Sequence, residues 1–158
     1  MATHRPVWIP IKWKRGWKRI ARVQQPAKID DWLTGNVVPI KQVPRKIRHH
    51  YRDTLMRAAE AARAYGKKVH VNSSYRDPAL QASWYANNMD PATGKPKPGR
   101  PLTAKPGTSP HERGIGLDIP NARITPGLIE ELRKRELIDD VPSEIWHLTN
   151  HAALKLGA

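Results

Sequence analysis

The sequence of 158 residues contains no cysteine and no phenylalanine. Without cysteine there is no disulfide bond, no thiolate-bound zinc and no cysteine nucleophile, so any metal must be held by nitrogen and oxygen. No apolar run reaches the length of about 20 residues that a membrane-spanning helix needs. The basic N-terminus carries no apolar segment typical of a secretory signal, which predicts synthesis in the cytoplasm. Six tryptophans and four tyrosines are left to supply the aromatic bulk.

Negative charge is also scarce, because 28 lysines and arginines face only 14 acidic residues, and the net charge is +14. Such an excess predicts attraction to an anionic partner: nucleic acid, an acidic membrane surface or an acidic wall polymer. Charge alone does not distinguish among these partners. The alternative interpretation is that the positive charge only keeps the protein soluble. No nucleic-acid-binding motif occurs in the sequence, so no specific nucleic acid is expected.

The length predicts one domain and, as the simplest assembly, a monomer. Residues 1–45 are rich in proline and place Trp8, Trp13 and Trp17 among lysines and arginines. This arm either presents a basic aromatic surface to a polyanion or bilayer, or packs its tryptophans on the domain. We favour the second interpretation, and assign residues 46–158 to the folded domain.

The rest of the chain mixes helical and strand patterns without a regular alternation, which predicts an α+β fold with a small antiparallel sheet. Residues 88–108 have no periodicity and are expected to form a long loop that walls a cleft. The predicted elements are a helix from Pro44 to Gly66, a strand at 67–72, a helix at 78–87 capped by Asp77, a strand at 114–119, a helix at 125–135 capped by Thr125, and a last strand within 143–151 that turns into a short helix.

The strand predicted at 114–119 has two unlike faces. Ile115, Leu117 and Ile119 point to one side and predict a core face. The opposite face carries Gly114, Gly116 and Asp118, so two missing side chains lie beside a carboxylate. This bare face is suited to form the floor of a site.

Two histidines could join that carboxylate. His111 precedes the strand, and the segment "EIWH" supplies Glu144 and His147. Two imidazoles and one carboxylate with an open fourth position form a catalytic zinc set, and Glu144 is a candidate base. Because Glu144 and His147 are three residues apart, the strand must twist or end there for both to reach one metal. The alternative interpretation is that these residues only make hydrogen bonds.

Three motifs resemble one enzyme family. "SPHERGIGLD" is similar to the Ser-x-His-x-x-Gly-x-Ala-x-Asp signature of the zinc D-alanyl-D-alanine carboxypeptidases, which include VanX- and VanY-like peptidases and phage L-alanyl-D-glutamate endopeptidases. "EIWH" resembles the family's Glu-x-Trp-His, and "SSYRDPALQ" resembles its upstream Ser-x-x-Arg with a following glutamine. The motifs keep the family's order and span residues 73–147, about half of the chain.

The resemblance implies a hedgehog/DD-peptidase-like zinc peptidase fold with one zinc ion. It implies the following roles: His111, Asp118 and His147 as zinc ligands, Glu144 as catalytic base, Arg76 as the cation that stabilises the oxyanion, and Ser109, Gln81 and Gly116 as residues that shape the substrate pocket. The sequence departs from the family at Gly116, where alanine is usual, and at Ser74, where many relatives carry glycine.

The resulting hypothesis is a zinc peptidase of peptidoglycan stem peptides, and we favour a phage-type endolysin that cleaves the L-alanyl-D-glutamate bond. Such an enzyme is made in the host cytoplasm and acts on the wall after release. A D-alanyl-D-alanine carboxypeptidase or dipeptidase with the same zinc site is the closest alternative. A basic nucleic-acid-binding or wall-binding domain without activity is an alternative of another class. His151, four residues after His147, is either a residue behind the site or a surface histidine.

Overall fold

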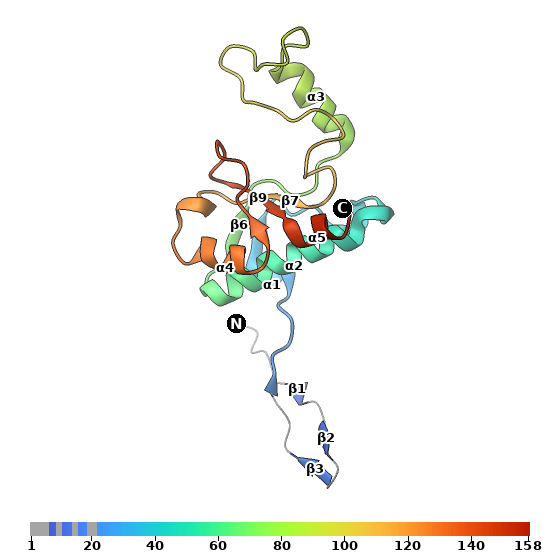
Figure 1. The fold of residues 1–158 in the computed structure, drawn as a ribbon, viewed down its shortest axis with the longest axis vertical. Helices are drawn as coiled ribbons and strands as arrows, with labels where there is room; N and C mark the ends of the chain where they lie inside the picture. The colour runs from blue at the N-terminus through green and yellow to red at the C-terminus, as the bar shows by residue number, and fades with distance from the viewer. Residues whose placement is uncertain (1–6, 9–10, 14–15, 19–21) are drawn as a thin grey trace.

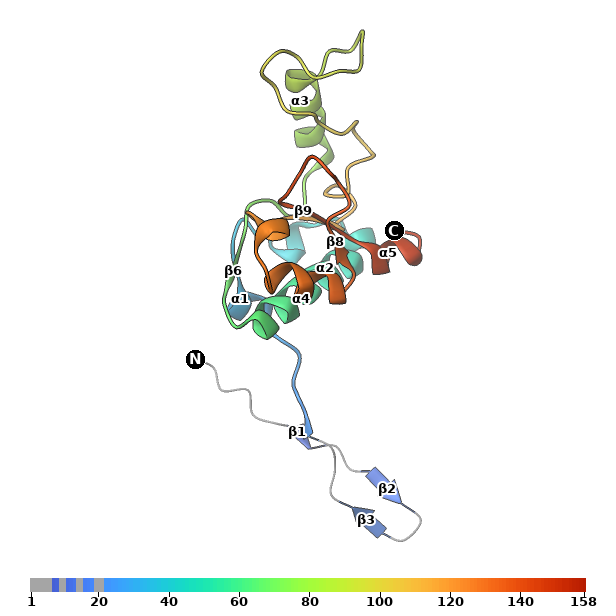
Figure 2. The same ribbon diagram turned by 60° about the vertical axis from the view of Figure 1, so that its left-hand side comes forward.

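The computed structural model describes residues 7–8, 11–13, 16–18 and 22–158, with side chains described from residue 24 onward. Near the N-terminus, four short strands form two antiparallel pairs, β1 (Val7–Trp8) with β4 (Arg22–Val23) and β2 (Ile11–Trp13) with β3 (Gly16–Lys18). Both views show these strands apart from the rest of the chain (Figures 1 and 2). The tryptophan side chains of the arm lie outside the described residues, so their packing and the division at residue 45 stay predictions.

The body is built around one long helix, α2 (Arg48–Tyr65), which confirms the helix predicted from Pro44. A single 3-10 turn, η2 (Arg45–Ile47), precedes it. Gly66 ends it in the left-handed conformation, at a φ of +86°, where the lack of a Cβ removes the strain. The buried face of α2 is formed by Tyr51, Thr54, Leu55, Ala58, Ala59, Ala61 and Ala62. Small alanines on this face allow α4 (Leu128–Lys134) to pack closely against α2.

Two small sheets meet next to α2. The antiparallel sheet has the order β7 (Gly116–Asp118), β9 (His147–Asn150) and β8 (Leu137–Ile138). The other is a parallel pair, β5 (Leu33–Gly35) with β6 (Val69–Val71). Two hydrogen bonds join the sheets, from Asn72 N to the Asp118 carbonyl (2.8 Å) and from Asp118 N to the Ser73 carbonyl (2.9 Å). The α+β prediction with a small antiparallel sheet is confirmed.

Residues before α2 also contribute to the core. The segment contains α1 (Ile29–Trp32), β5 and the 3-10 turn η1 (Ile40–Gln42). Ala27, Leu33 and Val43 are buried among the apolar side chains of α2, α4 and the sheets. Residues 24–43 therefore pack on the folded body through these side chains.

A separate lobe stands off the body in both views and consists of α3 (Pro78–Asn88) with the long loop that follows it (Figures 1 and 2). Asp77 caps α3 by accepting a hydrogen bond from Ala79 N (2.8 Å), as predicted. The loop runs through residues 89–108. An isolated antiparallel β-bridge pairs Met89 with Pro96 within it. A hydrogen bond from Arg76 N to the His111 carbonyl (3.2 Å) closes the base of this excursion.

Three boundaries differ from the sequence prediction. Helix α4 begins at Leu128 after Gly127, whose φ is +79°, and the predicted cap at Thr125 is wrong because that hydroxyl donates to the Asn121 carbonyl (2.8 Å). Strand β7 covers only half of 114–119, since Gly114 adopts a φ of +71° in the preceding turn. Strand β9 begins only at residue 147 and leads directly into α5 (His151–Lys155), the predicted short helix.

The remaining element is the 3-10 turn η3 (Ala122–Ile124), which follows β7. Within the part of the chain that the structure describes, no helix combines the length and the apolar character that crossing a bilayer requires.

Candidate metal centre and active site

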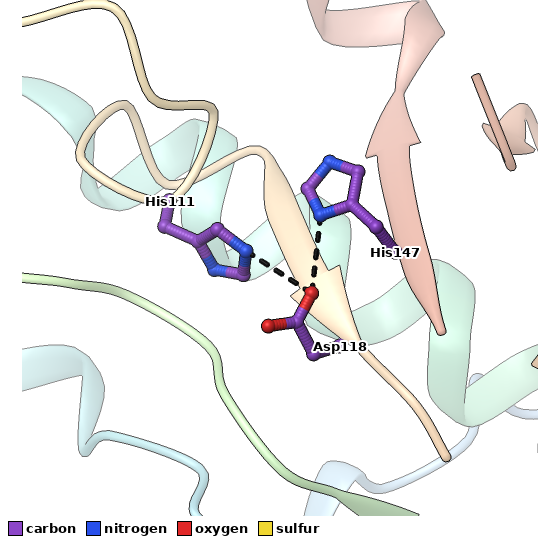
Figure 3. Close-up of side chains that lie close together, drawn as sticks. All are labelled: His111, Asp118 and His147. Carbon is purple, nitrogen blue, oxygen red and sulfur yellow. Dashed lines mark hydrogen bonds and ion pairs between the residues drawn. The ribbon is translucent and has the colours of Figure 1, made fainter. Parts of the chain in front are cut away.

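Three predicted ligands converge at the junction of β7 and β9. His111 comes from the turn before β7, Asp118 ends β7, and His147 begins β9 (Figure 3). Asp118 and His147 are paired in the antiparallel register, which brings their side chains together. Asp118 Oδ1 lies 3.2 Å from His111 Nε2 and 3.1 Å from His147 Nδ1. One ligand atom from each residue lies within 4.8 Å of the others, a spacing that suits a single metal ion.

The tautomer of His111 is fixed by the main chain. His111 Nδ1 lies 2.7 Å from the Ser74 carbonyl, which can only accept a hydrogen bond. Nδ1 therefore carries the proton of the neutral ring, and Nε2 is left with a free lone pair that faces Asp118. The imidazole is largely buried, and it lines the pocket described below.

The tautomer of His147 is fixed by a hydroxyl. His147 Nε2 lies 3.1 Å from Thr149 Oγ1, and that hydroxyl donates to Asp140 Oδ1 at 2.8 Å. Since a threonine hydroxyl has one hydrogen, its oxygen must accept from Nε2–H. His147 Nδ1 therefore also presents a lone pair to the Asp118 carboxylate.

Two ring nitrogens and one carboxylate oxygen thus face one another at distances that a shared cation, either a proton or a metal ion, would bridge. The set fits zinc, which prefers imidazole nitrogen and carboxylate oxygen in catalytic sites and keeps a fourth position open.

The electrostatics of Asp118 agree with a cation-binding role. Burial raises the pKa of the Asp118 carboxyl, but hydrogen bonds and positive charge from the facing rings of His111 and His147 lower it by more, and a bound metal ion would act in the same direction. The pKa is thereby held well below its usual range, and the Asp118 carboxyl is charged at neutral pH.

Glu144 lies beside the three ligands rather than among them. Its Oε2 is 3.9 Å from His147 Nδ1, and its side chain is 28% exposed. Glu144 belongs to the turn before β9, where its carbonyl accepts from His147 N (3.4 Å). The expected end of the strand between Glu144 and His147 is therefore observed, and both side chains reach the same site.

Arg76 approaches from the base of the lobe. Its guanidinium donates to Gln81 Oε1 (2.8 Å) and to Ser73 Oγ (3.1 Å), and it stacks 4.1 Å over the ring of Trp84. Burial lowers the pKa of Arg76, although the carboxylates of Asp118, Glu112 and Glu144 oppose this. An arginine stays charged under such a shift, so the site holds one fixed cation.

A pocket of about 400 Å³ lies between the lobe and the body. Its polar lining includes Arg76, Ser109, His111, Asp118, Glu144 and His147. Its apolar lining includes Trp84, Leu102, Val141 and Trp146. Trp84, Leu102 and Trp146 are exposed large side chains, as expected of a wall that a ligand covers. The long loop predicted to wall a cleft contributes residues 101–104 to this lining.

The other predicted pocket residues occupy different places. Ser109 is buried, and its hydroxyl accepts from His111 N (3.3 Å), which steadies the turn that carries the ligand. Gln81 is fully buried and joins Arg76 to the Ala104 carbonyl through its amide (2.7 Å). Gly116 backs onto the same turn, because a Cβ there would lie 2.9 Å from His111 N. Gln81 and Gly116 thus act on the pocket through their neighbours, and their contact with substrate stays a prediction.

Sequence reasoning missed four supporting residues. Glu112 accepts from Gly107 N (3.0 Å) and Ser109 N (3.2 Å) and thereby fixes the chain that enters His111. Ser74 orients His111, while Thr149 and Asp140 lie behind His147. Only Thr149 could have been found from the sequence. It lies two residues after His147, and residues two apart on a strand have their side chains on the same face.

Comparison with known proteins gave one family. The family model VanY, described as D-alanyl-D-alanine carboxypeptidase, matches residues 44–152. The matched region contains the three candidate ligands together with Arg76 and Glu144. No curated protein and no solved structure matched the chain.

Proposed function

Because the chain belongs to the VanY family of D-alanyl-D-alanine carboxypeptidases, which are peptidases that act on peptidoglycan, we propose that it is a zinc-dependent hydrolase of the stem peptide. We further propose that it cleaves the L-alanyl-D-glutamate bond as an endolysin. The observation that carries the zinc assignment is the convergence of three lone pairs from His111, Asp118 and His147 in the pocket that also contains Glu144 and Arg76.

The zinc would be held by His111 Nε2, one Asp118 oxygen and His147 Nδ1, with the Ser74 carbonyl and the Thr149 hydroxyl fixing the two rings. When bound, zinc supplies a Lewis acid that acidifies water and polarises a peptide carbonyl.

The side chains around the ligands supply the proton transfer and the charge. Glu144 accepts the proton of the attacking water and delivers it to the leaving amine, a role that typically contributes 10²–10⁴-fold in rate. Arg76 holds a positive charge next to the carbonyl oxygen, where negative charge develops. Its contacts with Gln81, Ser73 and Trp84 fix the guanidinium in advance, so little reorganisation is needed during the reaction.

Two observations support cleavage within the stem peptide. The net charge of +14 suits an enzyme that works on an anionic wall. The lobe adds an apolar wall, with Trp84 and Leu102, that can bind residues on either side of the cut bond. In the same proposal, the enzyme is made in the host cytoplasm and acts on the wall after release.

The second candidate is a D-alanyl-D-alanine carboxypeptidase, which the description of the matched family favours. The two substrates are chemically related. D-glutamate in the stem is linked through its γ-carboxyl, so its free α-carboxylate occupies the same position as the terminal carboxylate of D-alanyl-D-alanine. The same site can therefore cleave either bond, and the products of the reaction must be identified to show which bond is cut.

The test is digestion of purified peptidoglycan and of synthetic stem peptides, with the new ends identified by mass spectrometry. Wild type is compared with Glu144→Gln and with a chelator-treated sample restored by zinc. New L-alanine carboxyl and D-glutamate amino ends that need zinc and Glu144 would support the endopeptidase. Release of terminal D-alanine would move the activity to the carboxypeptidase. A folded, zinc-loaded protein that cleaves neither substrate would overturn the enzyme and favour a binding domain.

A further inference from the structure

A chain of hydrogen bonds runs from His147 away from the proposed metal. His147 Nε2 contacts Thr149 Oγ1 (3.1 Å), and Thr149 Oγ1 donates to Asp140 Oδ1 (2.8 Å). The other Asp140 oxygen, Oδ2, lies 2.8 Å from His151 Nε2. We call these residues the Thr149–Asp140–His151 chain. It connects a buried imidazole with a histidine whose side chain is 34% exposed.

The fold fixes each member of this chain independently. Thr149 lies two residues after His147 on β9, so both side chains are on the same face. Asp140 follows β8, in which Ile138 pairs with Thr149. His151 begins α5, and its main-chain N donates to the Glu136 carbonyl (2.8 Å). The main chain therefore brings the three residues close together.

The hydrogen bonds of the Thr149–Asp140–His151 chain are donated towards Asp140 from both sides. The Asp140 carboxylate only accepts, so the single hydrogen of the Thr149 hydroxyl points to it. The Thr149 oxygen must then accept from His147, which places the ring proton on Nε2. The opposite tautomer would direct an Nδ1–H at Asp118 and leave Nε2 facing an oxygen that has no hydrogen to give.

We infer that Thr149 and Asp140 are positioning residues that hold His147 in the tautomer and ring orientation that leave Nδ1 free for zinc, and that His151 anchors Asp140. The inference rests on the proposed zinc site. Partners of this kind behind a metal-bound histidine typically change metal affinity by 10–100-fold. It also assigns a role to His151, which lies outside the group of candidate ligands.

The test measures zinc affinity by competition with a chromophoric chelator for wild type, Thr149→Val and Thr149→Ser. Thr149→Val keeps the shape but removes the hydroxyl, and we expect zinc binding to weaken by about 10–100-fold. Thr149→Ser keeps the hydroxyl and should restore near wild-type affinity.

Thr54→Val is the matched control, because the Thr54 hydroxyl is also buried but donates to the Gly114 carbonyl instead. This control should lower stability and leave zinc affinity unchanged. His151→Ala, at the exposed end, should show a smaller loss than Thr149→Val.

A second readout uses the metal-free protein, in which ¹⁵N chemical shifts of the ring report the tautomer of His147. We expect Nε2–H in wild type and a mixture of tautomers in Thr149→Val. Wild type with the proton on Nδ1 would overturn the inference even if Thr149→Val fails to fold. Equal zinc affinity in wild type and a folded Thr149→Val would overturn it as well. Wild type that binds no zinc, with His147 still protonated at Nε2, would instead contradict the proposed function.

Discussion

His111 donates its Nδ1–H to the main-chain carbonyl of Ser74, 2.7 Å away, and so directs its Nε2 at Asp118. The Ser74 hydroxyl is also engaged, since it donates to the Asn36 carbonyl (2.8 Å) and accepts from Val38 N (3.0 Å). One residue thereby joins a zinc-ligand candidate to the layer before α2.

Ser74→Ala should lower the free energy of unfolding by about 1–3 kcal/mol, because it removes both hydrogen bonds of the buried Ser74 hydroxyl, to the Asn36 carbonyl and from Val38 N. The main-chain carbonyl that holds His111 remains, so zinc affinity should fall by less than about tenfold. Urea unfolding and chelator competition measure the two effects. A collapse of zinc binding in a variant of normal stability would contradict this separation.

Zinc should raise the melting temperature of the wild type, because a ligand that binds only the folded state stabilises it by about 2.7 kcal/mol at a concentration of 100 Kd. His111→Ala removes one of the three ligand atoms and should abolish most of this increase. Differential scanning calorimetry with and without zinc measures it. An equal increase in His111→Ala would place the metal elsewhere.

Glu144→Gln should reduce kcat by about 10²–10⁴-fold while zinc still binds, because the amide cannot accept the proton but keeps the shape. Steady-state kinetics on a stem peptide, together with zinc titration, would show this pattern. Unchanged kcat would exclude Glu144 as the base, and lost zinc binding would make it a ligand.

Arg76→Lys should lower kcat by about 10²–10³-fold with little change in KM. Lysine keeps the charge but cannot contact Gln81 and Ser73 together or stack in the same way on Trp84. Separate kcat and KM values decide the outcome. A rise in KM alone would assign Arg76 to substrate binding rather than to the transition state.

Asp139 should make stability depend on pH below neutrality. Hydrogen bonds from Arg133 and Arg123 hold the pKa of Asp139 at about 2, against 3.8 for a free aspartate. A lowered pKa stabilises the folded state at high pH, so this contribution is complete above about pH 4 and is lost as the pH falls towards 2.

Asp139→Asn should therefore be less stable than wild type by about 1–2 kcal/mol at pH 7, and the difference should shrink between pH 4 and pH 2. Urea unfolding of both proteins across this range measures it. A difference that does not vary with pH would assign the effect to packing rather than to charge.

The elements that sequence predicts well are those with a local signal. Gly66 and Asp77 mark helix ends through their own backbone and side-chain chemistry, and both ends are observed. The start of α4 was misplaced, because Gly127 competes with Thr125 and only the packed structure decides between them. The parallel pairing of β5 with β6 joins segments more than thirty residues apart, and no local pattern reports it.

The candidate site follows the same rule. The motifs of His111, Asp118 and His147 predicted a group that the structure indeed brings together. Asp140 and Ser74 could not be foreseen, since they reach the histidines only through the hairpin of β8 and β9 and through the junction of the two sheets. The face of Gly116 that sequence assigned to the site packs on the His111 turn, because only the fold shows what approaches a glycine.

The excursion from Asp77 to Pro110 leaves and re-enters the body at one point, where Arg76 N is bonded to the His111 carbonyl. The ligands, by contrast, are carried by β7, β9 and the turn at that point. Loop closure depends only weakly on loop length, so a different segment could be inserted there at little expense to folding. The lobe is thus a separable unit of the fold. A relative's lobe grafted between these two residues should change the bond preference, and it should retain the hydrolytic chemistry if it keeps Gln81, Trp84 and Ser109, which hold Arg76 and the His111 turn.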